Sequence, residues 1–253
     1  MKVEIISCLK DNYSYAIIDE KNKKTCIIDP SESKPIINFL EKNNLKLNYI
    51  LNTHHHFDHV GGNRELKKKY SAKVVGFEGD FERIPEIDIK LKDEEVWKEY
   101  NFEAKILHIP GHTLGHICFY FYNDNNLFTG DTLFSLGCGR IFEGTYQQMF
   151  SSLEKIKKLP PKTKIYCGHE YTLQNSKFCI QYDKENNNLI KKIKEINQKI
   201  KNDKPTVPST LEDELKNNIF LRSDENNIKT NLNIKNSSAL MTFSKLRDLK
   251  DNF

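Results

Sequence analysis

The chain has 253 residues, which is enough for one large domain or two smaller ones. Hydrophobic residues make up 38% and charged residues 29%, a composition that still allows an apolar core. The net charge of +4 is too small to indicate nucleic-acid binding, and it is compatible with an anionic small substrate. No apolar run reaches membrane-spanning length, and the N-terminal residues do not form a signal-peptide pattern.

Six cysteines are scattered along the chain without C-x-x-C spacing, mostly in apolar, strand-like contexts. This pattern favours buried, reduced thiols over disulfides or a thiolate metal site. We therefore expect a cytoplasmic protein. We also expect a monomer that acts on a small molecule and binds neither nucleic acid nor a membrane.

Residues 1–172 consist of short strands interleaved with helices, which favours an α/β layered domain. Strands are expected at 2–9, 13–19, 24–29, 47–53, 71–77, 102–111, 116–122, 126–131 and 163–170. The first three strands are expected to form an antiparallel set. Helices are expected at 33–44, 61–71 and 145–159, the first with Ser33 as its cap and Pro35 in its first turn.

The character of the chain changes after Thr172. Residues 174–202 carry apolar side chains at helical spacing, and 237–253 are expected to be helical again. Ser209, followed three residues later by Glu212, has the spacing of a capping box, whereas 223–236 are expected to form a surface loop. We therefore expect a catalytic domain at 1–172 and an α-helical domain at 173–253.

Half of the eight histidines lie in one short stretch, THHHFDHVGGN at 53–63. Alternate residues of an extended chain face the same way, so His54, His56 and Asp58 are expected on one side, with His59 beside Asp58 as the chain turns. His55 then points away. Two metal sets can form, one led by His54 and His56 and the other by Asp58 and His59.

Each set needs further donors from elsewhere in the chain. His112 in IPGHT, Asp131 in FTGDT and His169 in YCGHE each lie near the end of a predicted strand, beside a glycine that allows a sharp turn. Such loops can gather ligands at one edge of a sheet. Asp131 is the natural bridge between two cations. Imidazole and carboxylate donors without cysteine suit Zn²⁺, Fe²⁺ or Mn²⁺.

The pattern T-H-x-H-x-D-H-x-G-G with the later PGHT, GD and GHE resembles the metallo-β-lactamase superfamily. That resemblance implies an αββα sandwich over about residues 1–172. It does not define a reaction, because members of the superfamily hydrolyse lactams, thioesters, lactones and RNA, and some oxidise persulfides.

Further motifs resemble the glyoxalase II (hydroxyacylglutathione hydrolase) family: DNYSYAIID, FTGDTLFSLGCGRIFEGT, YCGHEYTLQN, TVPSTL and the terminal LRDLKDNF. The resemblance implies a helical C-terminal domain and two metal ions, most simply zinc. The first ion would be held by His54, His56 and His112 and the second by Asp58, His59 and His169, with Asp131 as the bridge.

Glutathione recognition is implied for Arg140, Tyr171, Arg247 and Lys250, which suits a ligand with two carboxylates. Phe142 belongs to the same region and departs from the family, in which a tyrosine is common. Metal sites also require side chains that orient their ligands. Asp29 at a strand end is the expected example, and His55 is a second.

The implied reaction is hydrolysis of S-(2-hydroxyacyl)glutathione, most simply S-D-lactoylglutathione, to a 2-hydroxy acid and glutathione. A metal-bridging hydroxide, oriented by Asp58, would attack the thioester carbonyl. The product with that substrate is D-lactate, and the reaction is the second step of methylglyoxal detoxification. The alternatives are a glutathione persulfide dioxygenase, a nuclease of the same superfamily and a non-enzymatic metal-binding protein.

Overall fold

A computed structural model describes all 253 residues, which form two compact units. Unit 1 comprises Met1–His108 and Gly115–Gly130, and unit 2 comprises Ile109–Leu114 and Asp131–Phe253. No helix in the protein is both long and apolar enough to span a membrane. The predicted domain boundary after Thr172 stays a prediction.

A mixed six-stranded sheet forms the first layer of unit 1. Its strands, in their order across the sheet, are β1 (Lys2–Cys8), β2 (Asn12–Asp19), β3 (Lys24–Ile28), β4 (Leu47–Leu51), β5 (Lys73–Phe77) and β6 (Ile87–Leu91). The predicted antiparallel arrangement of the first three is confirmed, and the strands from β3 to β6 run parallel. Every residue of β2 is buried, which explains why its sequence lacks polar alternation.

A second set of strands in unit 1 is antiparallel throughout. It contains β7 (Val96–Glu99), β8 (Phe102–His108), β9 (Ile117–Phe121) and β10 (Asn126–Gly130). Edge-to-face aromatic pairs join it to the first sheet, with Tyr15 against Phe128 and Tyr49 against Trp97, both at 5.3 Å between ring centroids. The core of unit 1 therefore includes a sheet-on-sheet layer, as the α/β prediction requires.

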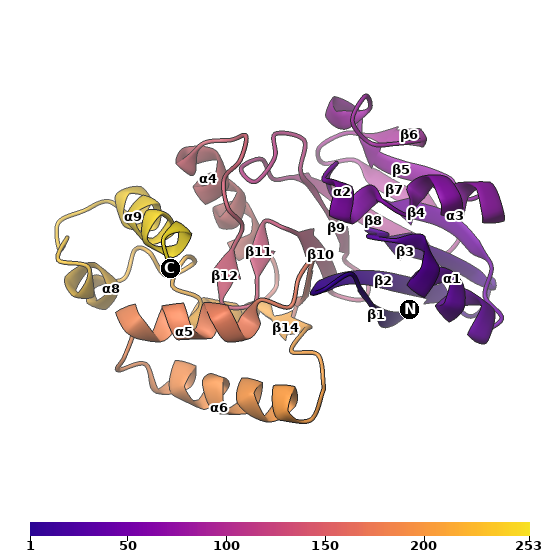
Figure 1. The fold of residues 1–253 in the computed structure, drawn as a ribbon. Coiled ribbons are helices and arrows are strands. Elements are labelled where there is room, and N and C mark those ends of the chain that lie inside the picture. Colours follow the sequence, from indigo (N-terminus) through magenta and orange to yellow (C-terminus); the bar gives the residue numbers. More distant parts are fainter. The chain divides into compact units, whose positions relative to one another are not determined.

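Helices cover the other face of the first sheet. α1 (Ser33–Lys42) and α3 (Asn63–Tyr70) lie side by side there (Figure 1). Their apolar side chains pack against strand residues such as Ile50, whose neighbour Tyr49 points to the opposite face. The short helices α2 (Phe57–Val60) and η1 (Glu78–Asp80) complete unit 1.

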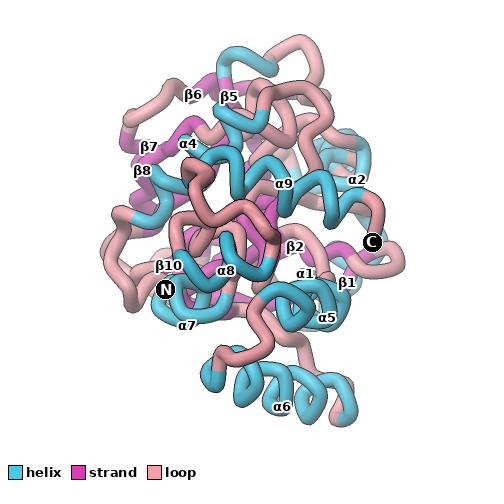
Figure 2. Tube along the Cα trace, turned by 90° about the vertical axis from the view of Figure 1, so that its left-hand side faces the viewer, coloured by secondary structure: helices cyan, strands magenta, loops and turns pink.

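Unit 2 is mainly helical. Its strands are β11 (Leu133–Phe134), β12 (Gly137–Cys138), β13 (Lys164–Cys167) and β14 (Ser209–Thr210). Its helices are α4 (Tyr146–Lys157), α5 (Thr172–Tyr182), α6 (Asn187–Lys201), α7 (Leu211–Asn217), α8 (Asn226–Asn231) and α9 (Ala239–Asp251). α5 runs along α6, and α9 lies beside α4 (Figures 1 and 2). This unit carries the helices that were expected after Thr172.

Three local predictions are wrong. The cap position of α1 is Glu32, because Ser33 already has a helical backbone and its hydroxyl donates to Glu65 instead. α7 is capped by Thr210, the last residue of β14, which accepts a hydrogen bond from the Asp213 amide, and Ser209 lies one residue before the cap. The segment expected to be a loop at 223–236 contains α8, which forms because Ile228 is fully buried.

Candidate metal and substrate site

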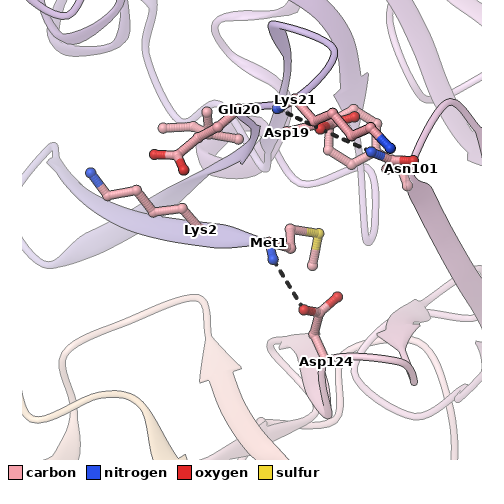
Figure 3. Close-up of a pocket in the computed structure, with 9 residues that line it drawn as sticks. Met1, Lys2, Asp19, Glu20, Lys21, Asn101 and Asp124 are labelled. Atoms are coloured by element: carbon pink, nitrogen blue, oxygen red, sulfur yellow. Dashed lines mark hydrogen bonds and ion pairs between the residues drawn. The ribbon is translucent and has the colours of Figure 1, made fainter.

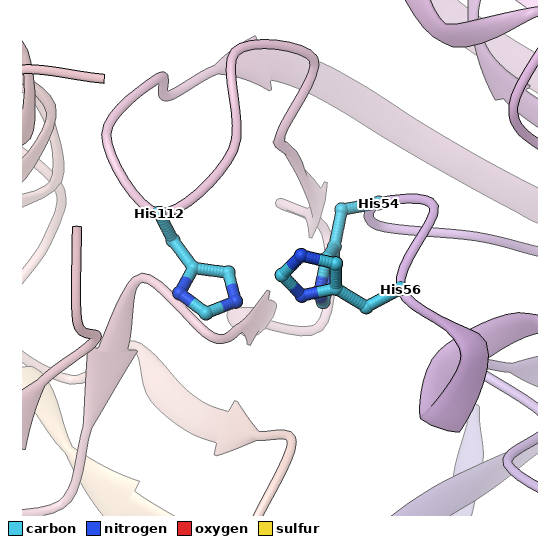
Figure 4. Close-up of side chains that lie close together, drawn as sticks. All are labelled: His54, His56 and His112. Carbon is cyan, nitrogen blue, oxygen red and sulfur yellow. The ribbon is translucent and has the colours of Figure 1, made fainter. Parts of the chain in front are cut away.

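The first histidines lie where β4 delivers the chain into a loop. His54 is fully buried and His56 is half-buried, and His54 Nε2 lies 3.2 Å from His56 Nδ1. Figure 4 shows these two imidazoles side by side on one loop, and also draws His112 on a loop of unit 2. Strand β4 ends at Leu51, the chain bends at residues 53 and 54, and Asp58 lies in the helical turn of α2. The prediction that Asp58 continues the alternation of an extended strand is therefore wrong.

The second pair of donors is held by α2. His59 is buried, and its Nε2 lies 3.7 Å from Asp58 Oδ2. Asn12, at the start of β2, donates its side-chain amide to both Asp58 Oδ2 and the Asp58 carbonyl, at 3.0 and 3.1 Å. Asn12 thus fixes the carboxylate of Asp58. The sequence motif DNYSYAIID contained it, but nothing in the motif assigned it this contact.

Asp29 lies at the end of β3 with a left-handed backbone (φ 48°) and a buried carboxylate. Its Oδ2 accepts hydrogen bonds from His59 Nδ1 at 2.9 Å and from the Thr53 hydroxyl at 2.6 Å, while Oδ1 accepts from the Thr53 amide at 2.8 Å. The Thr53 hydroxyl oxygen in turn lies 3.0 Å from His54 Nδ1. These bonds turn the Nε2 atoms of both imidazoles toward a ligand. Thr53 is a residue that sequence reasoning missed.

Unit 2 brings together the other three predicted donors. His112 Nε2 and His169 Nε2 lie 3.6 and 3.2 Å from the same oxygen, Asp131 Oδ2. His112 Nδ1 donates to the Arg140 carbonyl at 2.7 Å, which fixes its tautomer. The ring of His169 stacks on Tyr171 at 4.6 Å between centroids. A carboxylate that lies between two imidazoles is suited to bridge two metal ions.

A cavity of about 420 Å³ opens in unit 2 and is the size of a small-molecule site. All five predicted substrate residues line it, together with two predicted metal ligands: Arg140, Phe142, Tyr171, Arg247, Lys250, His112 and Asp131. Burial, together with the positive charge of Arg247, lowers the pKa of Lys250. Arg140, Arg247 and Lys250 give the lining of the cavity three basic side chains, which suits an anionic ligand.

The other three histidines have structural contacts. His108 stacks on Phe77 at 4.5 Å, and His116 is buried and stacks on His54 at 4.5 Å. His55 Nδ1 lies 3.0 Å from Asp80 Oδ2. Burial would raise the pKa of Asp80, but hydrogen bonds from His55 and Arg83 outweigh it and lower the pKa. The orienting role expected of His55 stays a prediction.

The prediction of buried free thiols is confirmed for all six cysteines. Cys138 lines the cavity in unit 2, but burial raises the pKa of its thiol to about 11 despite the nearby Arg247. A thiol with that pKa is almost entirely protonated at neutral pH, so Cys138 is a poor nucleophile.

Unit 1 contains a larger cavity of about 640 Å³, which none of the predicted site residues lines. The N-terminal amine donates to Asp124 at its edge, and Asp19 accepts from Asn101 and from the Lys21 amide (Figure 3). Asp19 and Asp124 are thus paired within the lining of this cavity, and none of the groups of potential metal donors lies there.

Comparisons with known proteins agree along the whole chain. The model of the metallo-beta-lactamase superfamily matches residues 10–169, and that of the hydroxyacylglutathione hydrolase C-terminus matches residues 170–253. The chain is 63% identical to a hydroxyacylglutathione hydrolase of Pelagibacter ubique (strain HTCC1062) over 100% of both chains. It is 42% identical to one of Methylococcus capsulatus, over 98% of this chain and 97% of the relative.

Solved structures show the same fold at low identity. A B3 metallo-beta-lactamase, BLEG-1, has a TM-score of 0.68 at 22% identity and covers 87% of this chain and 99% of its own. ETHE1 from Myxococcus xanthus has a TM-score of 0.68 at 20% identity, over 98% of this chain and 90% of its own. The predicted α/β fold class is confirmed. By sequence, fold and donor set, the chain belongs to the hydroxyacylglutathione hydrolases of the metallo-beta-lactamase superfamily.

Proposed function

We propose that this enzyme hydrolyses S-(2-hydroxyacyl)glutathione, with S-D-lactoylglutathione as its main substrate, to a 2-hydroxy acid and glutathione. With that substrate the product is D-lactate, as in the second step of methylglyoxal detoxification. The observation that carries the proposal is the cavity of unit 2, in which two metal donors share one space with Arg140, Arg247 and Lys250. A ligand with two carboxylates and a hydrolysable bond fits that combination.

The donor set suits divalent metal ions. Neutral imidazoles and carboxylates supply every predicted ligand, and no thiolate takes part, which is typical of a catalytic rather than a structural site. We propose two ions, zinc in the first instance with iron or manganese as alternatives. One would be held by His54, His56 and His112, and the other by Asp58, His59 and His169, with Asp131 shared. When bound, such ions activate water and polarise a carbonyl.

The protein's own side chains position the reactants. Asp58, held by Asn12, presents a carboxylate that can accept a hydrogen bond from the attacking water and orient it. Arg140 and Lys250 supply the positive charge that binds the carboxylates of glutathione. Tyr171 and Phe142 form aromatic walls of the cavity. With phenylalanine at 142, a phenol contact there is absent.

The leaving group needs no dedicated acid. A thiol has a pKa of about 8.5, so a thiolate departs readily near neutral pH. No serine or cysteine nucleophile is required, in keeping with the raised pKa of the Cys138 thiol. We further propose a monomeric, cytoplasmic enzyme that binds neither nucleic acid nor membranes, in keeping with its small net charge and buried thiols.

The test is a thioesterase assay on the metal-loaded protein with S-D-lactoylglutathione, following the loss of thioester absorbance. We expect turnover that a chelator abolishes and that added zinc restores. His54→Ala should abolish kcat, whereas Lys250→Ala should raise KM more than it lowers kcat. A loaded protein without turnover above the chelated control would contradict the proposal.

A further inference from the structure

We propose that Arg247 is a positioning residue for the metal ligand His112, acting through the backbone of residues 138–140. The inference rests on the proposed function only in taking His112 as a metal ligand. It assigns Arg247 a task at the metal centre, beyond the recognition of a substrate carboxylate. All of the residues that carry it belong to unit 2.

The first step is the burial of Arg247 on α9. Only 4% of the residue is exposed, and an arginine is rarely buried to this extent unless its charge is paired. Its Nη1 donates to the Cys138 carbonyl at 2.7 Å and lies 3.5 Å from the Gly139 carbonyl, while Nη2 donates to Asp251 at 2.9 Å. Both terminal nitrogens are thus engaged with the protein. A charge-assisted bond of this length holds the end of β12 firmly.

The second step is the close fit of Gly139. Its amide donates to the Thr132 carbonyl at 3.1 Å, and a Cβ at this position would lie 1.8 Å from the Asp131 carbonyl oxygen. The backbone of residue 139 therefore lies directly on the backbone of the predicted bridging ligand, and Arg247 contacts the carbonyls of residues 138 and 139. We therefore expect a displacement of the Cys138 carbonyl to disturb the contact of this segment with Asp131.

The third step leads to His112 itself. The next carbonyl along the chain, that of Arg140, accepts the hydrogen bond from His112 Nδ1. The amides of Phe142 and Glu143 donate to the His112 carbonyl at 3.2 and 3.3 Å. Residues 138–143 therefore determine both the position of the His112 backbone and the direction of its Nε2. A partner that orients a metal-bound imidazole contributes to metal affinity.

The partners of the charged groups in the cavity also distinguish Arg247 from Lys250. Asp251 Oδ1 accepts from Arg140 Nε at 3.2 Å as well as from Arg247, so it ties the two guanidinium groups together. Lys250 has no carboxylate partner; its ammonium lies over the rings of Phe178 and Phe253 at 5.3 and 4.8 Å. Lys250 is thus the cation on α9 that is available to an anionic ligand. Arg247 instead donates to the backbone that lines the cavity.

The experiment compares Arg247→Met with Lys250→Met, which removes a positive charge from the same helix. The zinc dissociation constant is measured by competition with a chromophoric chelator, and the cobalt-substituted proteins are compared by their visible absorption. We expect Arg247→Met to weaken zinc binding about tenfold, the lower end for loss of a partner that orients a ligand, and to alter the cobalt spectrum. Lys250→Met should leave both the zinc affinity and the cobalt spectrum unchanged, and it should raise KM more than it lowers kcat.

Arg247→Lys keeps a donor for the Cys138 carbonyl and should restore most of the zinc affinity, although it cannot also reach Asp251. Circular dichroism and thermal unfolding of the metal-free variants check that each one folds. Equal zinc affinity of Arg247→Met and Lys250→Met, with identical cobalt spectra, would overturn the inference. Because these measurements involve no thioester, failure of the proposed hydrolase activity would leave them interpretable.

Discussion

At the scale of single residues, the predicted metal donors are held by hydrogen bonds to groups outside the predicted ligand set. Asp29 orients His59 directly and His54 through Thr53, and the Arg140 carbonyl orients His112. Each of these bonds goes to Nδ1, so each leaves Nε2 for a ligand. The predicted donors acquire their geometry from these partners.

Asp29→Asn tests this support. Asparagine tolerates the left-handed backbone of residue 29, so the substitution removes the charge without straining the chain. An amide cannot accept from the Thr53 amide, the Thr53 hydroxyl and His59 together as a carboxylate does. We expect zinc affinity to fall by about 10- to 100-fold, as for other partners of ligand imidazoles. The measurement is zinc retained after dialysis against a chelator.

The matched control is Asp19→Asn, which removes a buried carboxylate from the neighbouring strand β2. Asp19 accepts hydrogen bonds from Asn22 and Asn101 and contacts no predicted ligand. Equal zinc retention by the Asp29 and Asp19 variants would show that the carboxylate of residue 29 does not support the site.

At the scale of elements, periodicity predicted most helices and central strands, because each buries one clear apolar stripe or run. β6 and β7 were not predicted. Exposed residues alternate with buried or half-buried ones in both strands, so they lack the apolar run of a central strand. The cap of α7 was misplaced by one residue because Ser209 and Thr210 offer the same hydroxyl chemistry, and only the folded chain shows that Thr210 accepts from the Asp213 amide.

The ends of α4 were predicted, but its contact with the loop that carries His112 was not. Its capping box joins Thr145 and Gln148 reciprocally. Further along the helix, the Ser152 hydroxyl donates to the Pro110 carbonyl at 2.8 Å, and Met149 packs against Gly111, where a Cβ would lie 2.7 Å away. The helix thus supports the loop that carries His112.

Thr145→Ala should remove the cap and lower the free energy of unfolding by about 1 kcal/mol, the usual value for such a substitution. Thr145→Ser keeps the hydroxyl and should retain most of that stability. Urea unfolding of the metal-free proteins, monitored by circular dichroism, compares the two variants with the wild type. If the alanine and serine variants unfold at the same urea concentration, the cap seen in α4 does not contribute to stability.

At the scale of the whole molecule, the seven predicted donors were recognisable because histidines and glycine turns recur at strand ends. Their supporting residues were not. Asn12 lies 46 positions from Asp58 and Arg247 lies 109 positions from Cys138, and only the folded chain defines those pairs. The same distance in sequence explains why the contact of Arg247 with the Cys138 carbonyl was not predicted: a terminal basic helix gives no sign that one of its charges is buried.

Burial of thiols across the protein predicts a shared response to alkaline pH. Burial raises the pKa of Cys138 to about 11 and those of Cys167 and Cys179 to about 12, from an ordinary value of 9.0. Between pH 9 and these values, the unfolded chain loses thiol protons that the folded chain retains. Stability therefore falls as the pH rises, by about 1.4 kcal/mol per pH unit for each such thiol.

Urea unfolding of the metal-free, reduced protein between pH 8 and pH 10.5 measures this slope. Cys179→Ala should lower the stability at pH 8, because it leaves a cavity in a fully buried site, yet it should flatten the decline above pH 9 by about one thiol's share, 1.4 kcal/mol per pH unit. The substitution thus lowers the stability at pH 8 but reduces the loss of stability above pH 9, so the effect of packing can be told apart from the effect of thiol ionisation. A variant whose stability falls as steeply as that of the wild type would mean that Cys179 ionises as readily in the folded protein as in the unfolded chain.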